Sequence, residues 1–140
     1  MRPRIILDTG PLVAFLHAGD RFHAWARQQF DTLPAPFLTC EPVIAESCHL
    51  LCRVPGGPDK IMELVARRAV QIDLALSTEL TSVAHLFRRY RDRPISLADA
   101  CLVRMTEIFD PSVVLTLDAN FLIYRRFGRR TIPVLHPDSH

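Results

Sequence analysis

The residues of this chain best suited to chemistry are four carboxylates separated by long stretches of sequence. Asp8 and Asp118 each follow a short apolar run that predicts a strand. Glu46 lies in a predicted helix, with Val43 three residues before it and Leu50 four residues after it, so its helix face is otherwise apolar. An ionised side chain on such a face needs a counter-charge, a proton or a metal ion.

The fourth acid, Asp99, lies three residues after Ser96, a spacing typical of a capping box with Asp in place of Glu or Gln. It also shares a predicted helix face with Ile95, Leu102 and Val103, which turns it toward the core. Taken singly, each aspartate can be explained as a turn or helix-capping residue. Taken together, four acids at strand ends and on inward helix faces predict a cluster.

A cluster of carboxylates has a particular chemistry. Like charges brought together raise one another's pKa, so the cluster needs cations. Mg²⁺ and Mn²⁺ prefer oxygen ligands and leave positions for water and phosphate oxygens, whereas zinc sites use histidine and cysteine. We therefore expect one or two Mg²⁺ or Mn²⁺ ions and metal-assisted hydrolysis of a phosphodiester.

The elements that would position the acids alternate between strands and helices. Strands are predicted over residues 4–7, 37–40, 70–73, 113–117 and 131–135. Helices are predicted from residue 11 and over about 20–33, 42–52, 59–69, 77–91, 96–109 and 119–127. This alternation is typical of an α/β domain with a mainly parallel sheet and helices on both faces. We found no repeat or linker, so residues 1–140 are expected to form one domain.

Composition supports one soluble domain. The 140 residues are 49% hydrophobic and 23% charged, which is enough apolar material for a core and excludes intrinsic disorder. No apolar run approaches the roughly 20 residues of a membrane helix. The four cysteines have no regular spacing, so we expect a cytoplasmic protein with reduced thiols. The formal charge is +2; without the four site acids, 17 bases face 11 acids, which gives +6.

These motifs resemble those of the PIN-domain family, and in particular of the VapC-type toxins of prokaryotic toxin-antitoxin pairs. The matching segments are ILDTG at Asp8, CEPVIAESCHLL at Glu46, SLADA at Asp99, and TLDANF with Thr116 and Asp118. Their order and spacing agree with the family over essentially the whole chain. The resemblance implies a single PIN-like, Rossmann-like domain, with a mainly parallel sheet of about five strands and the acids at its carboxyl edge.

The resemblance also implies a function. PIN-domain proteins of this type are metal-dependent ribonucleases that commonly form homodimers and are inhibited by a small antitoxin protein. By position, the metal would be bound by Asp8, Glu46, Asp99 and Asp118. Thr9 and Thr116 would hydrogen-bond the acids, water or phosphate, and Asn120 could assist. The expected activity is Mg²⁺- or Mn²⁺-dependent endoribonuclease cleavage of RNA.

Clusters of arginine could hold the RNA backbone. They occupy residues 67–68, 88–93 and 125–130; the first fits a solvated helix end, and the other two fit either helix ends or phosphate contacts. We consider Arg125 and Arg126 candidates for substrate binding, and Arg104 could reach the site or pair with an acid. The aromatic residues between the later arginines could stack on bases or pack in the core: Phe87, Tyr90, Tyr124 and Phe127.

Two other functions fit the same sequence. One is a PIN-domain nuclease of RNA maturation, or a nuclease acting on DNA, without an antitoxin. The other is a non-catalytic RNA-binding or protein-binding module, although the presence of all four acids favours a catalyst. A nucleotide-binding α/β protein is disfavoured because no glycine-rich loop follows the first strand.

Overall fold

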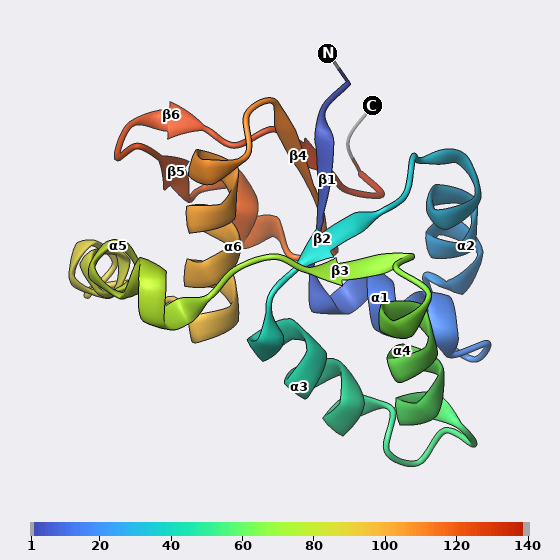
Figure 1. Ribbon diagram of the computed structural model, residues 1–140. Coiled ribbons are helices and arrows are strands. Elements are labelled where there is room, and N and C mark those ends of the chain that lie inside the picture. The colour runs from blue at the N-terminus through green and yellow to red at the C-terminus, as the bar shows by residue number, and fades with distance from the viewer. Residues whose placement is uncertain (1, 139–140) are drawn as a thin grey trace.

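A parallel sheet of five strands forms the centre of the computed structural model, which describes residues 2–138 (Figure 1). Its strands are β1 (Arg4–Leu7), β2 (Phe37–Thr39), β3 (Val70–Ile72), β4 (Ser112–Leu115) and β7 (Val134–Leu135). Their order is β3-β2-β1-β4-β7, and all neighbours are parallel. In chain order, β2 and β3 are thus added on one side of β1, and β4 and β7 are then added on the other side. Such a reversal of strand order is where open α/β sheets bind ligands.

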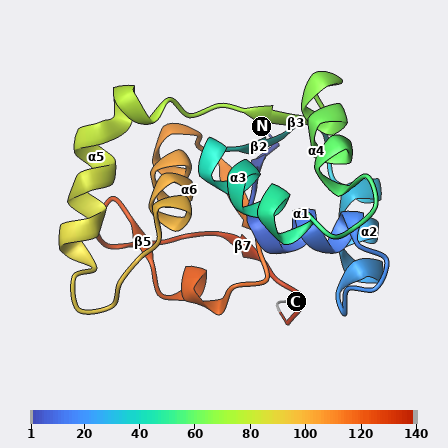
Figure 2. The same ribbon diagram turned by 90° about the horizontal axis from the view of Figure 1, so that it is seen from below.

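Six α-helices surround the sheet. They are α1 (Thr9–Leu16), α2 (His23–Thr32), α3 (Glu41–Leu50), α4 (Gly57–Ala66), α5 (Leu76–Arg89) and α6 (Leu97–Ile108). Helices α5 and α6 lie on one side of the strands and α2 and α4 on the other, as Figures 1 and 2 show. This arrangement confirms the predicted α/β fold with helices on both faces. None of the helices within residues 2–138 has the length and apolar character needed to span a membrane.

The core is centred on strands β1 and β4 and on helix α6. Residues 5–7 of β1 are buried, as apolar runs in central parallel strands usually are. Helix α6 is buried on most of its circumference, and its Leu102 and Met105 are fully inaccessible, as is Leu115 of β4. Burial of this helix fixes its first turn, which carries Asp99, relative to the ends of β1 and β4.

The C-terminal segment differs from the prediction. The predicted helix 119–127 is a single 3-10 turn, η1 (Ala119–Leu122), followed by a hairpin of β5 (Arg125–Arg126) and β6 (Arg130–Thr131). Phe121 and Tyr124 have the spacing of a helix. Both side chains are buried, although Phe121 lies in this short turn and Tyr124 lies just after it. Phe127 and Gly128 have positive φ angles of 51° and 80°, which turn the chain. The predicted strand 131–135 is therefore divided between β6 and β7.

Candidate active site

A pocket of about 620 Å³ opens at the carboxyl ends of β1 and β4, where the strand order reverses. Its walls come from the β1–α1 junction, α3, the first turn of α6 and the segment after β4. All four of the acids singled out in the sequence line it: Asp8, Glu46, Asp99 and Asp118. The fold thus brings together residues that are up to 110 positions apart in the chain.

Asp8 is the most buried of these acids, with 6% of the residue exposed. As the residue that caps α1, it accepts a hydrogen bond from the Thr9 backbone N–H at 2.7 Å. Its other carboxylate oxygen accepts from Thr116 Oγ1 at 2.6 Å, and Thr116 Oγ1 accepts from the Asp118 backbone N–H at 2.9 Å. One buried hydroxyl therefore fixes both strand-end aspartates.

Asp99 has two separate contacts that resolve its two possible roles. Its backbone N–H donates to Ser96 Oγ at 3.0 Å, so Ser96 caps α6. Its carboxylate accepts from the Tyr124 hydroxyl at 3.1 Å and lines the pocket. The side chain is therefore not the second half of a capping box.

Glu46 and Asp118 lie at the more open part of the pocket. Glu46 is exposed, and so is Leu50 at 55%; both line the pocket. The expectation that Glu46 lies on an inward helix face was therefore wrong, because this face of α3 borders the open pocket. Asp118 Oδ1 accepts from the Asn120 backbone N–H at 2.9 Å, which caps η1. Asp118 thus combines a capping contact with a place in the pocket.

Burial and mutual repulsion raise the pKa values of the inner acids. The pKa of Asp8 is raised to about 6, mainly by burial, against the lowering effect of its hydrogen bonds from Thr116 and Thr9. The pKa of Asp99 is raised to about 7, again first by burial and then by the charges of Asp8 and Asp118. The site therefore favours protons or cations near neutral pH.

The donors of this pocket fit a hard divalent cation. Within residues 2–138, no three histidine, cysteine or acidic side chains are already arranged as a metal site. The four pocket acids supply only oxygen ligands, and such ligands suit Mg²⁺ or Mn²⁺ ions that retain several waters. Thr9 Oγ1 is a buried pocket oxygen without a hydrogen-bond partner among the described residues. Both observations favour an additional polar ligand in the pocket.

A family model described as the PIN domain matches residues 5–126. The chain belongs to the PIN-domain family. This match confirms the family that the four sequence motifs indicated.

The chain is also 26% identical to Ribonuclease VapC26 of Mycobacterium tuberculosis, over 81% of this chain and 86% of that protein. The fold is similar to the crystal structure of Mycobacterium tuberculosis VapC20, titled a sarcin-ricin loop cleaving toxin. That match has a TM-score of 0.68 and 22% identity, covering 90% of this chain and 98% of that one.

Three arginines proposed from the sequence as substrate ligands lie outside the PIN-domain pocket. Arg104 pairs with Glu79 at 2.7 Å and Glu107 at 3.1 Å. Arg126 is 5% exposed and pairs with Asp110 at 3.1 Å, so burial keeps it from RNA. Arg125 Nη1 donates to three nearby backbone carbonyls. Of the two alternatives for Arg104, the structure shows pairing with acids, and the substrate contact expected of Arg126 is corrected, since the charges of both residues are used within the fold.

Tyr124 is a pocket residue that the sequence predicts only as a packing or stacking aromatic. It is 1% exposed and packs edge-on against Phe121 and Tyr90, and its hydroxyl donates to Asp99. Burial and the neighbouring Asp99 charge raise its own pKa, so it remains a donor. The sequence signal that could have indicated this role is the tyrosine itself, because a buried tyrosine hydroxyl requires a polar partner.

Replacing Tyr124 by Phe is expected to raise the pKa of Asp99, because the lost hydroxyl donates a hydrogen bond that lowers it. NMR titration of the Asp99 carboxyl in the metal-free protein measures this effect. Tyr90→Phe is the matched control, since the Tyr90 hydroxyl accepts from the Arg125 backbone N–H and contacts no carboxylate. Equal Asp99 titration in the two variants would contradict the assigned contact.

Proposed function

We propose that this PIN-domain protein is a Mg²⁺- or Mn²⁺-dependent endoribonuclease and the toxin of a VapBC-type toxin-antitoxin pair. The observation that carries the proposal is the convergence of four acids in one pocket at the sheet's reversal point. The similarity to Ribonuclease VapC26 and to the VapC20 toxin supports RNA as the substrate and a small antitoxin as the partner.

In the proposed mechanism, the ions would be held by Asp8, Glu46, Asp99 and Asp118. When bound, one or two such ions would supply activation of water and stabilisation of charge on the phosphate. The protein's own residues orient the ligands: Thr116 fixes Asp8 through its hydroxyl, and Tyr124 fixes one oxygen of Asp99. Thr9 Oγ1, buried and without a partner among the described residues, is available to hydrogen-bond water or a phosphate oxygen. Asn120 is exposed and lines the same pocket, and we propose that it contacts the RNA.

Removal of divalent ions is expected to abolish RNA cleavage, because without them the pocket presents only repelling carboxylates to a phosphate. Excess EDTA should stop cleavage of a labelled RNA, and added Mg²⁺ or Mn²⁺ should restore it. The expected products carry 5′-phosphate and 3′-hydroxyl ends. Isothermal titration gives a second readout: Mn²⁺ should bind the wild type and bind Asp8→Asn at least about tenfold more weakly. Undiminished cleavage in EDTA would contradict the metal-dependent mechanism.

The toxin assignment predicts growth arrest. Induced expression in bacteria should stop growth, and co-expression of a small partner protein encoded with it should restore growth. Native purification is expected to yield this partner in stoichiometric amount, with the toxin as a cytoplasmic homodimer. A nuclease that cleaves RNA in vitro but neither arrests growth nor co-purifies with a partner would instead be an enzyme of RNA maturation.

A further inference from the structure

A second pocket lies between α5 and the β5–β6 hairpin, separate from the acidic pocket. Its volume is about 400 Å³, and its walls consist of Ser82, His85, Leu86, Arg89, Glu107, Phe127 and Gly128. None of these residues lines the acidic pocket. We call it the hairpin pocket.

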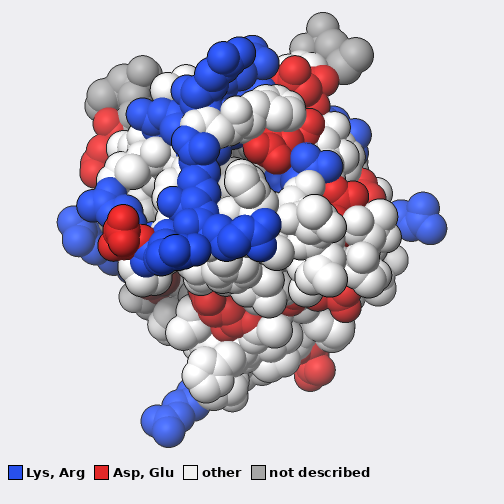
Figure 3. All heavy atoms as spheres, turned by 90° about the vertical axis from the view of Figure 1, so that its left-hand side faces the viewer, with Lys and Arg blue, Asp and Glu red and all other residues white. Residues whose placement is uncertain are grey.

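The face around the hairpin pocket is strongly basic. Figure 3 shows a broad band of Lys and Arg side chains on this face, over α5 and the hairpin. Two sequence clusters meet here, and their exposed members are Arg88, Arg89, Arg91, Arg93, Arg129 and Arg130. None of these six forms an ion pair with another residue of the described part of the chain. Their charges are thus available to a polyanion, unlike those of Arg104 and Arg126.

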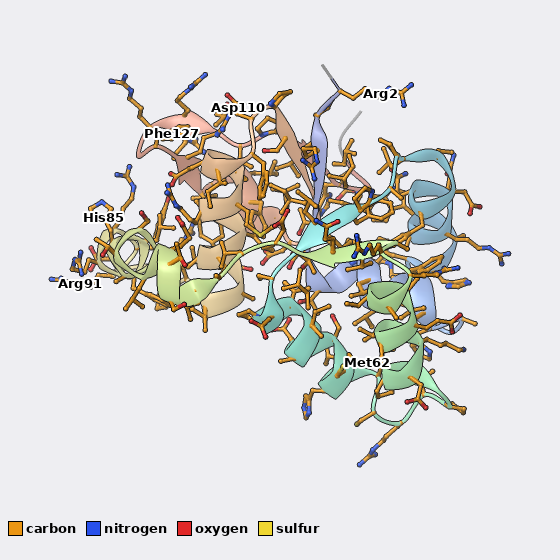
Figure 4. The ribbon with its side chains drawn as sticks, viewed as in Figure 1. Arg2, Met62, His85, Arg91, Asp110 and Phe127 are labelled. Carbon is orange, nitrogen blue, oxygen red and sulfur yellow. The ribbon has the colours of Figure 1, made fainter. Side chains whose placement is uncertain are left out.

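The hairpin holds an aromatic ring at the edge of this pocket. Phe127 is 50% exposed although its backbone φ angle is +51°, which few non-glycine residues adopt. Its backbone N–H donates to Glu107 Oε2 at 2.6 Å, and Arg89 donates to the Gly128 carbonyl. Figure 4 shows Phe127 on the hairpin and His85 on α5 on the same side of the molecule. The hairpin backbone that carries the ring is therefore held by contacts to two helices.

The one acid in the hairpin pocket does not cancel the basic surroundings. Glu107 accepts hydrogen bonds through both carboxylate oxygens, from Arg104 at 3.1 Å and from the Phe127 N–H. Arg104 is shared with Glu79, so these contacts compensate the Glu107 charge only in part, but that single charge is outnumbered by the six unpaired arginines around the pocket. The exposed Phe127 ring and the unpaired arginines suit a single-stranded nucleic acid, because its bases stack on aromatic rings and its phosphates pair with guanidinium groups.

We propose that the hairpin pocket is a second RNA-binding site, which holds one base of the substrate against Phe127 while the surrounding arginines contact phosphates. The site rests on the proposed ribonuclease function and adds a substrate contact remote from the bond that is cleaved. It explains why two arginine clusters separated by more than 30 residues lie on one face without acidic partners.

The arginine contacts are tested by fluorescence anisotropy with a labelled uridine 20-mer, in EDTA so that no cleavage occurs. The variant Arg88→Gln/Arg129→Gln should bind about tenfold more weakly at low salt. Its salt slope, log Kd against log salt concentration, should fall by about 1.4, since each lost phosphate contact on a single strand removes about 0.7. The matched control is Arg67→Gln/Arg68→Gln, an exposed basic pair beyond α4, which should bind like the wild type.

The aromatic contact is tested by Phe127→Ala. Loss of one stacked base should weaken binding about 5- to 100-fold with an unchanged salt slope. Leu80→Ala is the control, because Leu80 is 58% exposed on α5 and lines neither pocket. Thermal melting verifies that each variant is folded.

Wild-type affinity in both hairpin-pocket variants would overturn the site, and so would an equal loss in the Arg67/Arg68 control, which would indicate only a net-charge effect. These outcomes are separate from the fate of the proposed function. If the wild type cleaves RNA in a metal-dependent manner while the variants bind normally, the ribonuclease assignment stands and the second site is wrong. If the wild type binds the 20-mer through this face but cleaves no RNA, the ribonuclease assignment is wrong.

Discussion

Asp99→Asn is expected to reduce RNA cleavage by about 100-fold or more while making the metal-free protein more stable. Activity falls because an amide is a weaker ligand for a divalent ion than a carboxylate. Stability rises because the variant no longer has to ionise a carboxyl group beside Asp8 and Asp118, whose charges raise its pKa to about 7. Lower activity together with higher stability would identify Asp99 as a residue that serves function at a cost in folding stability.

The stability effect has a defined pH dependence. Since the folded-state pKa of Asp99 lies above the unfolded value of 3.8, the folded protein binds more protons between about pH 4 and 7. The contribution of Asp99 to stability is present below pH 4 and is lost as pH rises through 7. The free energy of unfolding of the variant, relative to that of the wild type, should therefore increase between about pH 4 and 7 and stay higher above pH 7. After discounting for partial exposure, the gain at pH 8 is about 1–3 kcal/mol.

Urea unfolding of metal-free protein at pH 4 and pH 8, together with a cleavage assay in Mg²⁺, measures both effects. Glu63→Gln is the control, because Glu63 is an exposed acid on α4 outside the pocket. It should change neither cleavage nor the pH dependence of stability. An Asp99→Asn protein that cleaves RNA normally, or that is less stable than the wild type at pH 8, would refute this account.

Thr116→Val is expected to reduce cleavage by about 10- to 100-fold although none of the four acids proposed to bind metal is altered. Valine has the shape of threonine but lacks the hydroxyl that donates to Asp8 and accepts from the Asp118 N–H. The pKa of Asp8 should rise further, because the Thr116 hydrogen bond lowers it. The buried Asp8 carboxylate loses a donor, so stability at pH 8 should fall by about 1–3 kcal/mol.

Thr39→Val is the matched control for this substitution. Thr39 is also fully buried at a strand end on the same edge of the sheet, and its hydroxyl donates to the Leu7 carbonyl at 2.8 Å. Its loss should lower stability but preserve cleavage, whereas Thr116→Ser should restore most of the activity. If Thr39→Val impairs cleavage as much as Thr116→Val, the effect is one of folding and Thr116 has no specific positioning role.

The strands and the acids could be predicted because their signals are local. The run before Asp8 is short, β-branched and apolar, and a buried parallel strand requires this pattern. Asp8 and Asp118 could be placed in one site because parallel strands end at the same edge. The sequence correctly indicated Glu46 as a pocket residue through its apolar neighbours, but Leu50 beside it lines the open pocket rather than the core.

The C-terminal segment and the arginines could not be predicted because they depend on distant partners. Residues 119–127 have the spacing of a helix, but Tyr124 is held by Asp99, 25 residues away in the sequence. Likewise, nothing near Arg126 in the sequence reveals that Asp110 and the Thr106 carbonyl hold it in the core. Exposed and paired arginines look alike in a sequence when their acidic partners are remote.

The central position of β1 has a consequence for the newly made chain. The Thr116 hydroxyl that holds Asp8 is contributed 108 residues later, by the segment following β4. During synthesis on the ribosome, β1 therefore has only β2 to pair with until β4 emerges, and the two halves of the acidic pocket are still apart. In the proposed ribonuclease, this order would withhold activity from the incomplete chain. RNA cleavage would require that the segment through Asp118 has left the ribosome and can fold against β1.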